Sequence, residues 1–282
     1  MKTMFNFLAM VLFVVMFSNA WAFNLATGKE GGMYDKVGNY YLPKQTDKRI
    51  SVNCTNTIGS SANGELLKSG VVDGAIIQAD YLAQHPELNV EVVAELYNEY
   101  VFMLSRKDSG IKSVGDLSDK NKIAIDRADS GTQITWNSFC AQDKRYKAIP
   151  TEPLAGTIAQ SKLRSGDVNA VMFVSGLGGS DITRANQAGE FRLMNVDDGD
   201  FDNAKYKGKK VYKFVKVDSS SYPSLFPGMF NGSVETIAIP ALFVVRSDWA
   251  SEHQGEFDKL YDAVQKMATV IQADQKKMSE GK

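Results

Sequence analysis

Four segments of the sequence combine glycine with small hydroxyl residues and could bind an anion through backbone N–H groups. They cover residues 27–34, 59–63, 130–132 and 175–179. Such turns at helix N-termini expose unpaired N–H groups and the positive end of the helix dipole, so they can hold a carboxylate without a dedicated arginine. The candidate ligand-binding residues are Thr27, Gly28, Gly32, Tyr34, Gly59, Ser60, Asn63, Gln78, Arg127, Ser130, Gly131, Thr132, Ser175 and Gly176.

Three polar side chains could add to these loops. Tyr34 lies one helical turn beyond the first loop, so it could cover a bound ligand or pack inside the helix. Gln78 and the nearby Asp80 end a strand, and they could bind a ligand ammonium or cap the helix that follows. Arg127 is the one arginine placed near an anion loop, where it could pair with a ligand carboxylate.

Acid–base, thiol and metal chemistry have few residues available. The 282 residues include two histidines, His85 and His253, and two cysteines, Cys54 and Cys140. Neither histidine adjoins a nucleophile motif, and no G-x-S-x-G, HExxH or Walker A pattern occurs. With 32 basic against 33 acidic residues, the chain has no basic excess for nucleic acid. We expect a ligand-binding protein without catalytic residues, metal or cofactor.

The first 22 residues have the pattern of an export signal. Lys2 precedes an apolar run at residues 4–17, and Ala20 and Ala22 occupy the −3 and −1 positions of a cleavage site. The alternative is a membrane anchor, which would need about 20 apolar residues. We predict cleavage after Ala22, so that an exported protein begins at Phe23.

Apolar strands alternate with helices along the rest of the chain and determine where the loops lie. The pattern predicts strands at residues 23–27, 50–55, 74–78, 90–96 and 122–126, and helices at residues 33–41 and 60–69. Capping boxes at residues 130–133 and 157–160 predict two further helix starts. This alternation is typical of an α/β fold with a mostly parallel sheet, in which ligands bind beyond the carboxyl ends of the strands.

A short repeat suggests two lobes. Residues 68–77 and 164–173 each end a helix with a basic residue, Ser and Gly, and then begin a buried strand. Such junctions also occur by chance in α/β proteins. Residues 97–107 and 234–246 are long apolar runs that could cross between the lobes, with Pro240 at a bend or an edge.

These features predict two Rossmann-like lobes joined by a two-stranded hinge. The first lobe would contain residues 23–98 plus 240–282, and the second residues 99–239. A final helix at residues 248–275 carries an apolar stripe that should pack on the first lobe, and residues 197–210 should form a solvated loop. The stripe consists of Phe257, Leu260, Tyr261, Val264, Met267, Ala268 and Ile271.

The two cysteines fall in different predicted lobes. Export would permit a Cys54–Cys140 disulfide. Because such a bridge would restrict motion between the lobes, we favour two separate buried thiols.

Short motifs follow one another along nearly the whole exported chain. They are Thr27-Gly28-x-x-Gly31-Gly32-x-Tyr34, Thr57-Ile58-Gly59-Ser60-x-x-Asn63, Asp73-Gly74-Ala75-Ile76-Ile77-Gln78-Ala79-Asp80, Leu96-Tyr97-x-Glu99, Lys107-Asp108-Ser109-Gly110-Ile111, Asp116-Leu117, Ser130-Gly131-Thr132 and Thr236-Ile237-Ala238. Their order resembles that of the TAXI solute-binding proteins, the periplasmic receptors of one class of TRAP transporters. The turn at residues 126–129 departs from the family, which usually has Gly and Pro there, and residues 140–157 are short for it.

The resemblance implies a type II periplasmic-binding-protein fold and a small carboxylate-bearing ligand, often a glutamate-like amino acid. It also implies delivery of the ligand to a TRAP permease in the membrane, and we expect a monomer. Three alternatives stay open: a receptor for an ABC transporter, an enzyme on the same fold with Cys140 as its only candidate nucleophile, and a sensory module.

Overall fold

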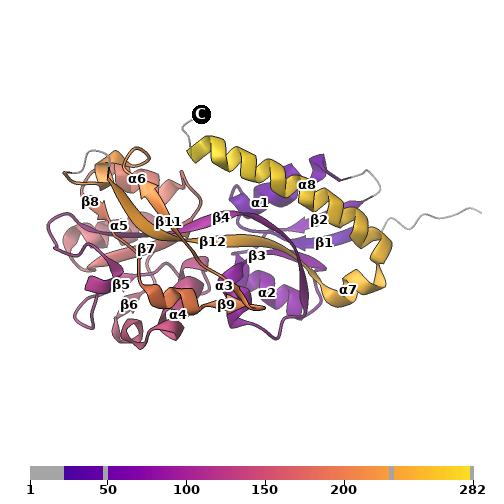
Figure 1. The fold of residues 1–282 in the computed structure, drawn as a ribbon, viewed down its shortest axis with the longest axis horizontal. Helices are drawn as coiled ribbons and strands as arrows, with labels where there is room; N and C mark the ends of the chain where they lie inside the picture. Colours follow the sequence, from indigo (N-terminus) through magenta and orange to yellow (C-terminus); the bar gives the residue numbers. More distant parts are fainter. Residues whose placement is uncertain (1–21, 47–49, 229–231, 280–282) are drawn as a thin grey trace, which may run out of the picture.

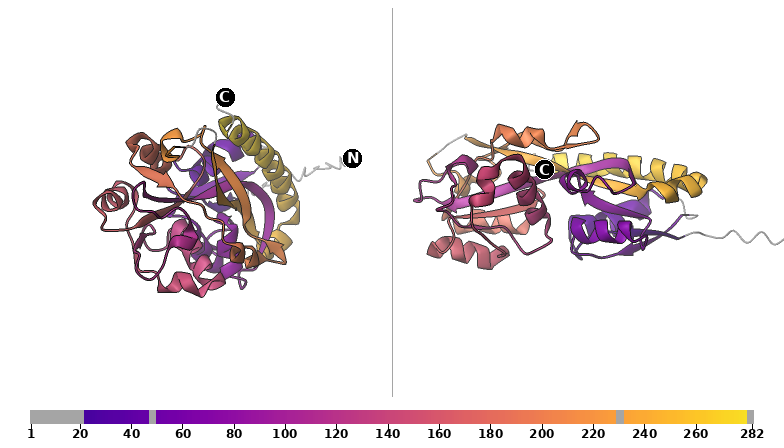
Figure 2. Two further views of the ribbon diagram at one scale, coloured as in Figure 1. Left: turned by 60° about the vertical axis from the view of Figure 1, so that its left-hand side comes forward. Right: turned by 90° about the horizontal axis from the view of Figure 1, so that it is seen from below.

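The structure is a computed structural model that describes residues 22–46, 50–228 and 232–279. The predicted export signal falls on residues 1–22, of which all but Ala22 lie outside the described residues. Two α/β lobes lie side by side and are joined by long strands (Figures 1 and 2). None of the helices in the described ranges has the length and apolarity needed to cross a membrane.

The strands are β1 Ala22–Ala26, β2 Ser51–Thr55, β3 Gly74–Gln78, β4 Val90–Arg106, β5 Ile123–Ala124, β6 Thr151–Glu152, β7 Ala170–Ser175, β8 Phe191–Leu193, β9 Lys205–Tyr206, β10 Lys209–Lys210, β11 Lys213–Asp218 and β12 Ser233–Arg246. The α-helices are α1 Met33–Lys36, which continues as a π-helix over Val37–Tyr41, α2 Ser60–Lys68, α3 Ala79–Gln84, α4 Gly131–Gln142, α5 Gly156–Ser165, α6 Ser180–Ala188, α7 Ser247–Glu252 and α8 Gln254–Ser279.

One path of paired strands runs through both lobes in the order β2-β1-β3-β12-β4-β7-β5-β6. The outer strands of each lobe are parallel: β1 pairs with β2 and β3, and β5 pairs with β6 and β7. In the first lobe β12 lies antiparallel to β3, and in the second β4 lies antiparallel to β7. The lobes therefore repeat one arrangement, which confirms the predicted α/β fold of two Rossmann-like lobes.

Strands β4 and β12 form the predicted two-stranded connection. They pair antiparallel, and Pro240 lies opposite Asn98. On its other edge β12 pairs with β11 up to Ala238 and with β3 from Ala241, so the proline occupies the gap where its missing N–H interrupts neither ladder. The strand predicted at residues 90–96 is present, but it is antiparallel rather than parallel and is continuous with the crossing run as the start of β4.

The helix–glycine–strand repeat is present in both lobes. Gly70 after α2 and Gly166 after α5 have φ of 71° and 84°, a backbone conformation that favours glycine. Space for a side chain is limited as well. A Cβ added at Gly70 would lie 2.8 Å from a guanidinium nitrogen of Arg246, and one added at Gly166 would lie 2.5 Å from a guanidinium nitrogen of Arg106. Each crossing strand thus ends in an arginine that covers the glycine of the lobe it enters.

Two predictions about local structure are wrong. Residues 157–160 form no capping box, because α5 begins at Gly156 after Ala155, and Gln160 Nε2 donates to the carbonyl oxygen of Asp181 at 2.9 Å. Residues 197–210 are not simply a solvated loop. Phe201 is fully buried and stacks on Phe139 of α4 with ring centroids 3.8 Å apart, and the hairpin β9–β10 follows it.

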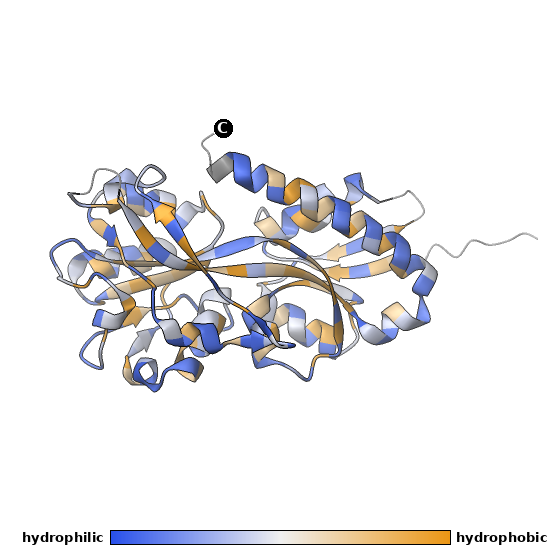
Figure 3. Cartoon of the chain, viewed as in Figure 1, coloured by the Kyte–Doolittle hydropathy of each residue, from blue (hydrophilic) through white to orange (hydrophobic). Residues whose placement is uncertain are grey.

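Helix α8 packs on the first lobe as predicted, although the predicted continuous helix breaks at His253 into α7 and α8. Its buried stripe joins a core with β1, β3, β4 and β12, whereas Tyr261 of the predicted stripe is 43% exposed. Figure 3 shows the hydrophobic strands at the centre and a polar outer face on α8. A second core combines residues of both lobes, including Leu82 of α3, Trp136 of α4 and Tyr212.

Candidate ligand-binding site

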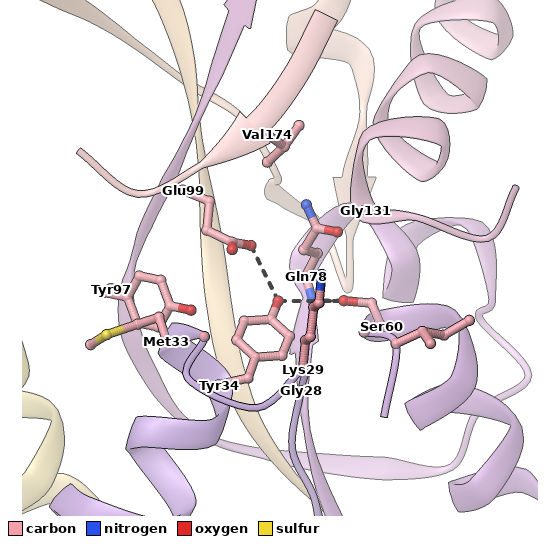
Figure 4. A pocket seen from close by; sticks show the side chains of 13 residues that line it. Gly28, Lys29, Met33, Tyr34, Ser60, Gln78, Tyr97, Glu99, Gly131 and Val174 are labelled. Atoms are coloured by element: carbon pink, nitrogen blue, oxygen red, sulfur yellow. Dashed lines mark hydrogen bonds between the residues drawn. The ribbon is translucent and has the colours of Figure 1, made fainter. Parts of the chain in front are cut away.

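A pocket of about 180 Å³ lies where the two lobes meet. Its wall includes the first loop, the start of α2, the end of β3 and the middle of β4, together with Gly131 of α4 and Val174 of β7 from the second lobe (Figure 4). Seven predicted residues line it: Gly28, Gly32, Tyr34, Gly59, Ser60, Gln78 and Gly131. The carboxyl end of β3 and the helix starts therefore meet at one cavity, as ligand sites in α/β sheets do.

Tyr34 lies in α1 with its hydroxyl at the pocket and its ring in the core of the first lobe, so both of its predicted roles stay open. Its hydroxyl donates to Glu99 Oε2 at 3.2 Å and lies 3.4 Å from Ser60 Oγ. The ring is buried against Gly28, where an added Cβ would come within 2.7 Å of the Tyr34 Cβ. Gly28 is thus required for the loop to pass this close to the tyrosine.

Glu99 brings a carboxyl group into the pocket from the crossing strand β4. Burial raises its pKa to about 8, the nearby Asp80 adds to the rise, and the hydrogen bond from Tyr34 opposes it. Burial likewise raises the pKa of Tyr34, as does the charge of Glu99. The group has no ion-pair partner among the described residues.

Gln78 connects the two lobes at the floor of the pocket. Its backbone N–H donates to Ser60 Oγ at 3.0 Å, which holds the end of β3 against α2. Its side chain lies over Gly131, because a Cβ there would come within 2.3 Å of Gln78 Oε1. The amide nitrogen Nε2 has no hydrogen-bond partner in the described part of the chain.

Four predicted residues support the loops from behind the pocket. Asn63 donates to the carbonyl oxygens of Thr27 and Ile76, both at 2.7 Å, and Thr27 Oγ1 donates to the carbonyl oxygen of Thr55 at 3.1 Å. Ser130 accepts from the N–H of Gln133 at 3.2 Å as the cap of α4, and Thr132 Oγ1 accepts from the N–H of Val174 at 3.1 Å. These side chains fix the positions of the loops rather than line the cavity.

The remaining predicted residues do not meet at the pocket. Arg127 is exposed, and Ser175 and Gly176 are half-buried beyond Val174. Asp80 is fully buried elsewhere, where it accepts hydrogen bonds from Thr135 Oγ1 at 2.7 Å and Tyr212 Oη at 3.1 Å. Burial raises its pKa to about 6, although its hydrogen bonds oppose the rise.

Six lining residues were not predicted: Lys29, Met33, Ile58, Tyr97, Glu99 and Val174. Tyr97 and Glu99 belong to the Leu96-Tyr97-x-Glu99 motif, and their spacing of two places both side chains on one face of a strand. That spacing within a crossing strand was the available signal.

Metal and thiol chemistry find little support around the site. Within the described ranges, no group of three His, Cys, Asp or Glu residues could hold a metal ion. Cys54 and Cys140 are two separate free thiols, as we expected from the sequence in preference to a disulfide, and both are partly buried. Burial raises the pKa of Cys54 to about 11 and also raises that of Cys140, which disfavours the reactive thiolate.

The two lobes, the crossing strands and the pocket between them define the fold of the periplasmic binding proteins. A putative sulfonate-binding protein of an ABC transporter from Methylobacillus flagellatus has a similar structure, with a TM-score of 0.57, 16% identity, and coverage of 92% of this chain and 71% of that one. A putative L-cystine ABC transporter protein from Listeria monocytogenes has a TM-score of 0.51 and 14% identity, and the match covers 87% of this chain and 89% of that one. A chain of the ATP phosphoribosyl transferase (HisG:HisZ) complex from Thermotoga maritima has a TM-score of 0.51 and 13% identity, and the match covers 88% of this chain and 98% of that one. At these identities the likeness concerns the fold.

The chain belongs to the NMT1-like family, whose model matches residues 25–280.

Proposed function

We propose that this protein is a periplasmic solute-binding protein that captures a small carboxylate-bearing solute, a glutamate-like amino acid or an organic acid. The observation that carries the proposal is the pocket between the lobes, into which α2 of one lobe and α4 of the other direct their N-termini. First-turn N–H groups lack partners within a helix, so they can bind a carboxylate. We infer that residues 23–98 plus 240–282 and residues 99–239 close on the solute.

Binding can be tested by thermal shift and calorimetry. A ligand at 100 times its dissociation constant adds about 2.7 kcal/mol to the free energy of unfolding. We expect at least one acidic amino acid or dicarboxylate to raise the melting temperature, and Tyr34→Ala to weaken that response while the protein stays folded. If no compound in the panel has an effect, the proposed ligand class is wrong.

We further propose that the solute is delivered to a TRAP-type permease and that the receptor acts as a monomer. The ordered motifs support this assignment, whereas the similar structures include receptors of ABC transporters. Transport into membrane vesicles that contain the partner permease separates the two classes. An ion gradient should drive TRAP transport without ATP, and a strict need for ATP would indicate an ABC system instead.

A further inference from the structure

We infer that the pocket selects α-amino acids, because Glu99 binds the ligand ammonium while the N-termini of α2 and α4 hold the ligand carboxylate. The inference rests on the proposed function and narrows its ligand class. An organic acid that has an oxo or hydroxyl group in place of the ammonium would bind more weakly.

The first observation is an uncompensated carboxyl group. Glu99 lines the pocket, and its hydrogen bond comes from the neutral hydroxyl of Tyr34. A buried carboxylate is costly unless a cation or hydrogen-bond donors pair with it. Lys29 also lines the pocket, but it is exposed and forms no ion pair with Glu99. Without ligand the Glu99 carboxyl group therefore keeps its proton, and a ligand ammonium could pair with its ionised form.

The second observation is a pair of buried polar atoms without partners in the described residues, Tyr97 Oη and Gln78 Nε2. Both side chains line the pocket and both are 2% exposed. Buried polar atoms are usually hydrogen-bonded, so these two atoms are available to bind a ligand in the pocket. An ammonium donates three hydrogen bonds, which Glu99 and Tyr97 could accept. The amide nitrogen Nε2 of Gln78 can only donate, so it suits a ligand carboxylate.

The third observation is the separation of the two kinds of group across the pocket. Glu99 and Tyr97 lie together on one side of Tyr34, and Ser60 and Gly131 lie on the other (Figure 4). Ser60 begins the nine-residue α2, whose cap Gly59 offers no side chain, and Gly131 begins the twelve-residue α4. The pocket is therefore polarised to fit a zwitterion. A dicarboxylate would place its second carboxylate beside Glu99, so the two groups could not both be ionised without repulsion, whereas an ammonium can pair with the ionised form of Glu99.

Proton release gives the inference a signature of its own. Because the pKa of Glu99 is raised to about 8, the group is mostly protonated at pH 7 without ligand. A bound ammonium favours the carboxylate, so binding should release about one proton per ligand at pH 7. The groups near Glu99 are Tyr34, Tyr97, Asp80 and Lys29. Both tyrosines have pKa values raised well above their usual range and stay neutral there.

The experiment compares matched ligands by calorimetry on the exported chain. The pairs are L-glutamate with 2-hydroxyglutarate, L-aspartate with L-malate, and L-alanine with L-lactate, each titrated in two buffers of different ionisation enthalpy. We expect each amino acid that binds to bind roughly 10- to 100-fold more tightly than its hydroxy counterpart, with release of about one proton. Glu99→Gln should lose the preference and the proton release.

Glu91→Gln is the matched control, because it removes the same charge from the same strand at an exposed position away from the pocket. It should bind like the unchanged protein. Hydroxy acids that bind as tightly as the amino acids, or a Glu99→Gln variant with unchanged affinity, would overturn the inference and leave the proposed function standing. If neither member of any pair binds, both the inference and the proposed function are wrong.

Discussion

Glu99 should make the free energy of unfolding depend on pH when no ligand is bound. Its pKa is raised from 4.5 in the unfolded reference to about 8 in the folded protein, so the folded state binds the proton more tightly. Its contribution to stability is therefore present below pH 4.5, is lost as the pH rises to 8, and stays constant above.

The variant Glu99→Gln removes this dependence and keeps an oxygen for the Tyr34 hydroxyl. We expect it to be as stable as the unchanged protein near pH 4.5 and more stable by roughly 1–3 kcal/mol at pH 9. Urea denaturation at pH 5, 7 and 9 measures the difference. A difference that does not change with pH would mean that Glu99 titrates normally.

The variant Gly131→Ala tests how closely the two lobes approach each other at the pocket. An added methyl group would collide with Gln78 Oε1 at 2.3 Å, so Gly131→Ala should displace that side chain and weaken ligand binding about 10-fold or more, without unfolding the protein. Gly176→Ala is the matched control, because no atom lies within 4 Å of an added Cβ there. Equal affinities of the two variants for one ligand, measured by calorimetry, would contradict this account.

The site residues differ in how far the sequence alone could predict them. Gly28 and Ser60 were found because glycine and hydroxyl residues beside predicted helix starts indicate anion binding. Asn63 belongs to the same pattern, but it supports the loop from behind, and nothing local distinguishes the two roles. Tyr97 and Glu99 were missed because the strand that carries them meets the loops only after residues distant in sequence have folded together.

At the scale of elements, α3 of the first lobe is tied to the second lobe by polar contacts. Asp80 accepts from Thr135 and Tyr212, and Gln84 Nε2 donates to the carbonyl oxygen of Ile134 at 3.0 Å. Lys207, in the turn between β9 and β10, donates to the carbonyl oxygen of Val90 at 3.2 Å. The lobes are therefore connected by more than the crossing strands.

Tyr212→Phe should weaken this connection. It removes a hydrogen bond to the buried Asp80, which typically costs about 1–3 kcal/mol of the free energy of unfolding. Tyr206→Phe is a close control, because its buried hydroxyl has no partner in the part of the chain that is described, so its loss should cost nothing. Chemical denaturation compares the two, and equal losses would mean that the Tyr212 hydroxyl does not stabilise the fold.

Elements defined by local pattern were predicted better than those defined by distant contacts. The residue range of β3 matches the prediction because its apolar run lies between clear turn signals. Residues 197–210 were misassigned because their polar composition conceals Phe201, whose stacking partner Phe139 lies far away in the sequence. The break at His253 also escaped prediction, since the nearby Gly255 is the main residue that disfavours a helix and a single glycine is tolerated within one.

At the scale of the whole molecule, the two lobes share their largest structural units. Strands β4 and β12 run through both, and one hydrophobic core contains residues of α3 and β3 from the first lobe and of α4 from the second. Unfolding one lobe would expose part of the core of the other. We therefore expect the molecule to unfold as one cooperative unit, although the proposed closure on a solute would move the lobes as two bodies.

Two buried tryptophans allow this cooperativity to be measured, because each lobe contains one when the protein is produced from Phe23 onward, without Trp21. Trp249 lies in α7 of the first lobe and Trp136 in α4 of the second. Trp136→Phe leaves a reporter of the first lobe, and Trp249→Phe leaves a reporter of the second. In each variant the fluorescence midpoint in urea should coincide with the far-ultraviolet circular dichroism midpoint, since the latter reports all helices and strands. Comparing two signals within one variant cancels the stability cost of the substitution itself. If the fluorescence midpoint of one variant falls at a lower urea concentration than its circular dichroism midpoint, the lobes unfold separately. The shared core then does not couple them.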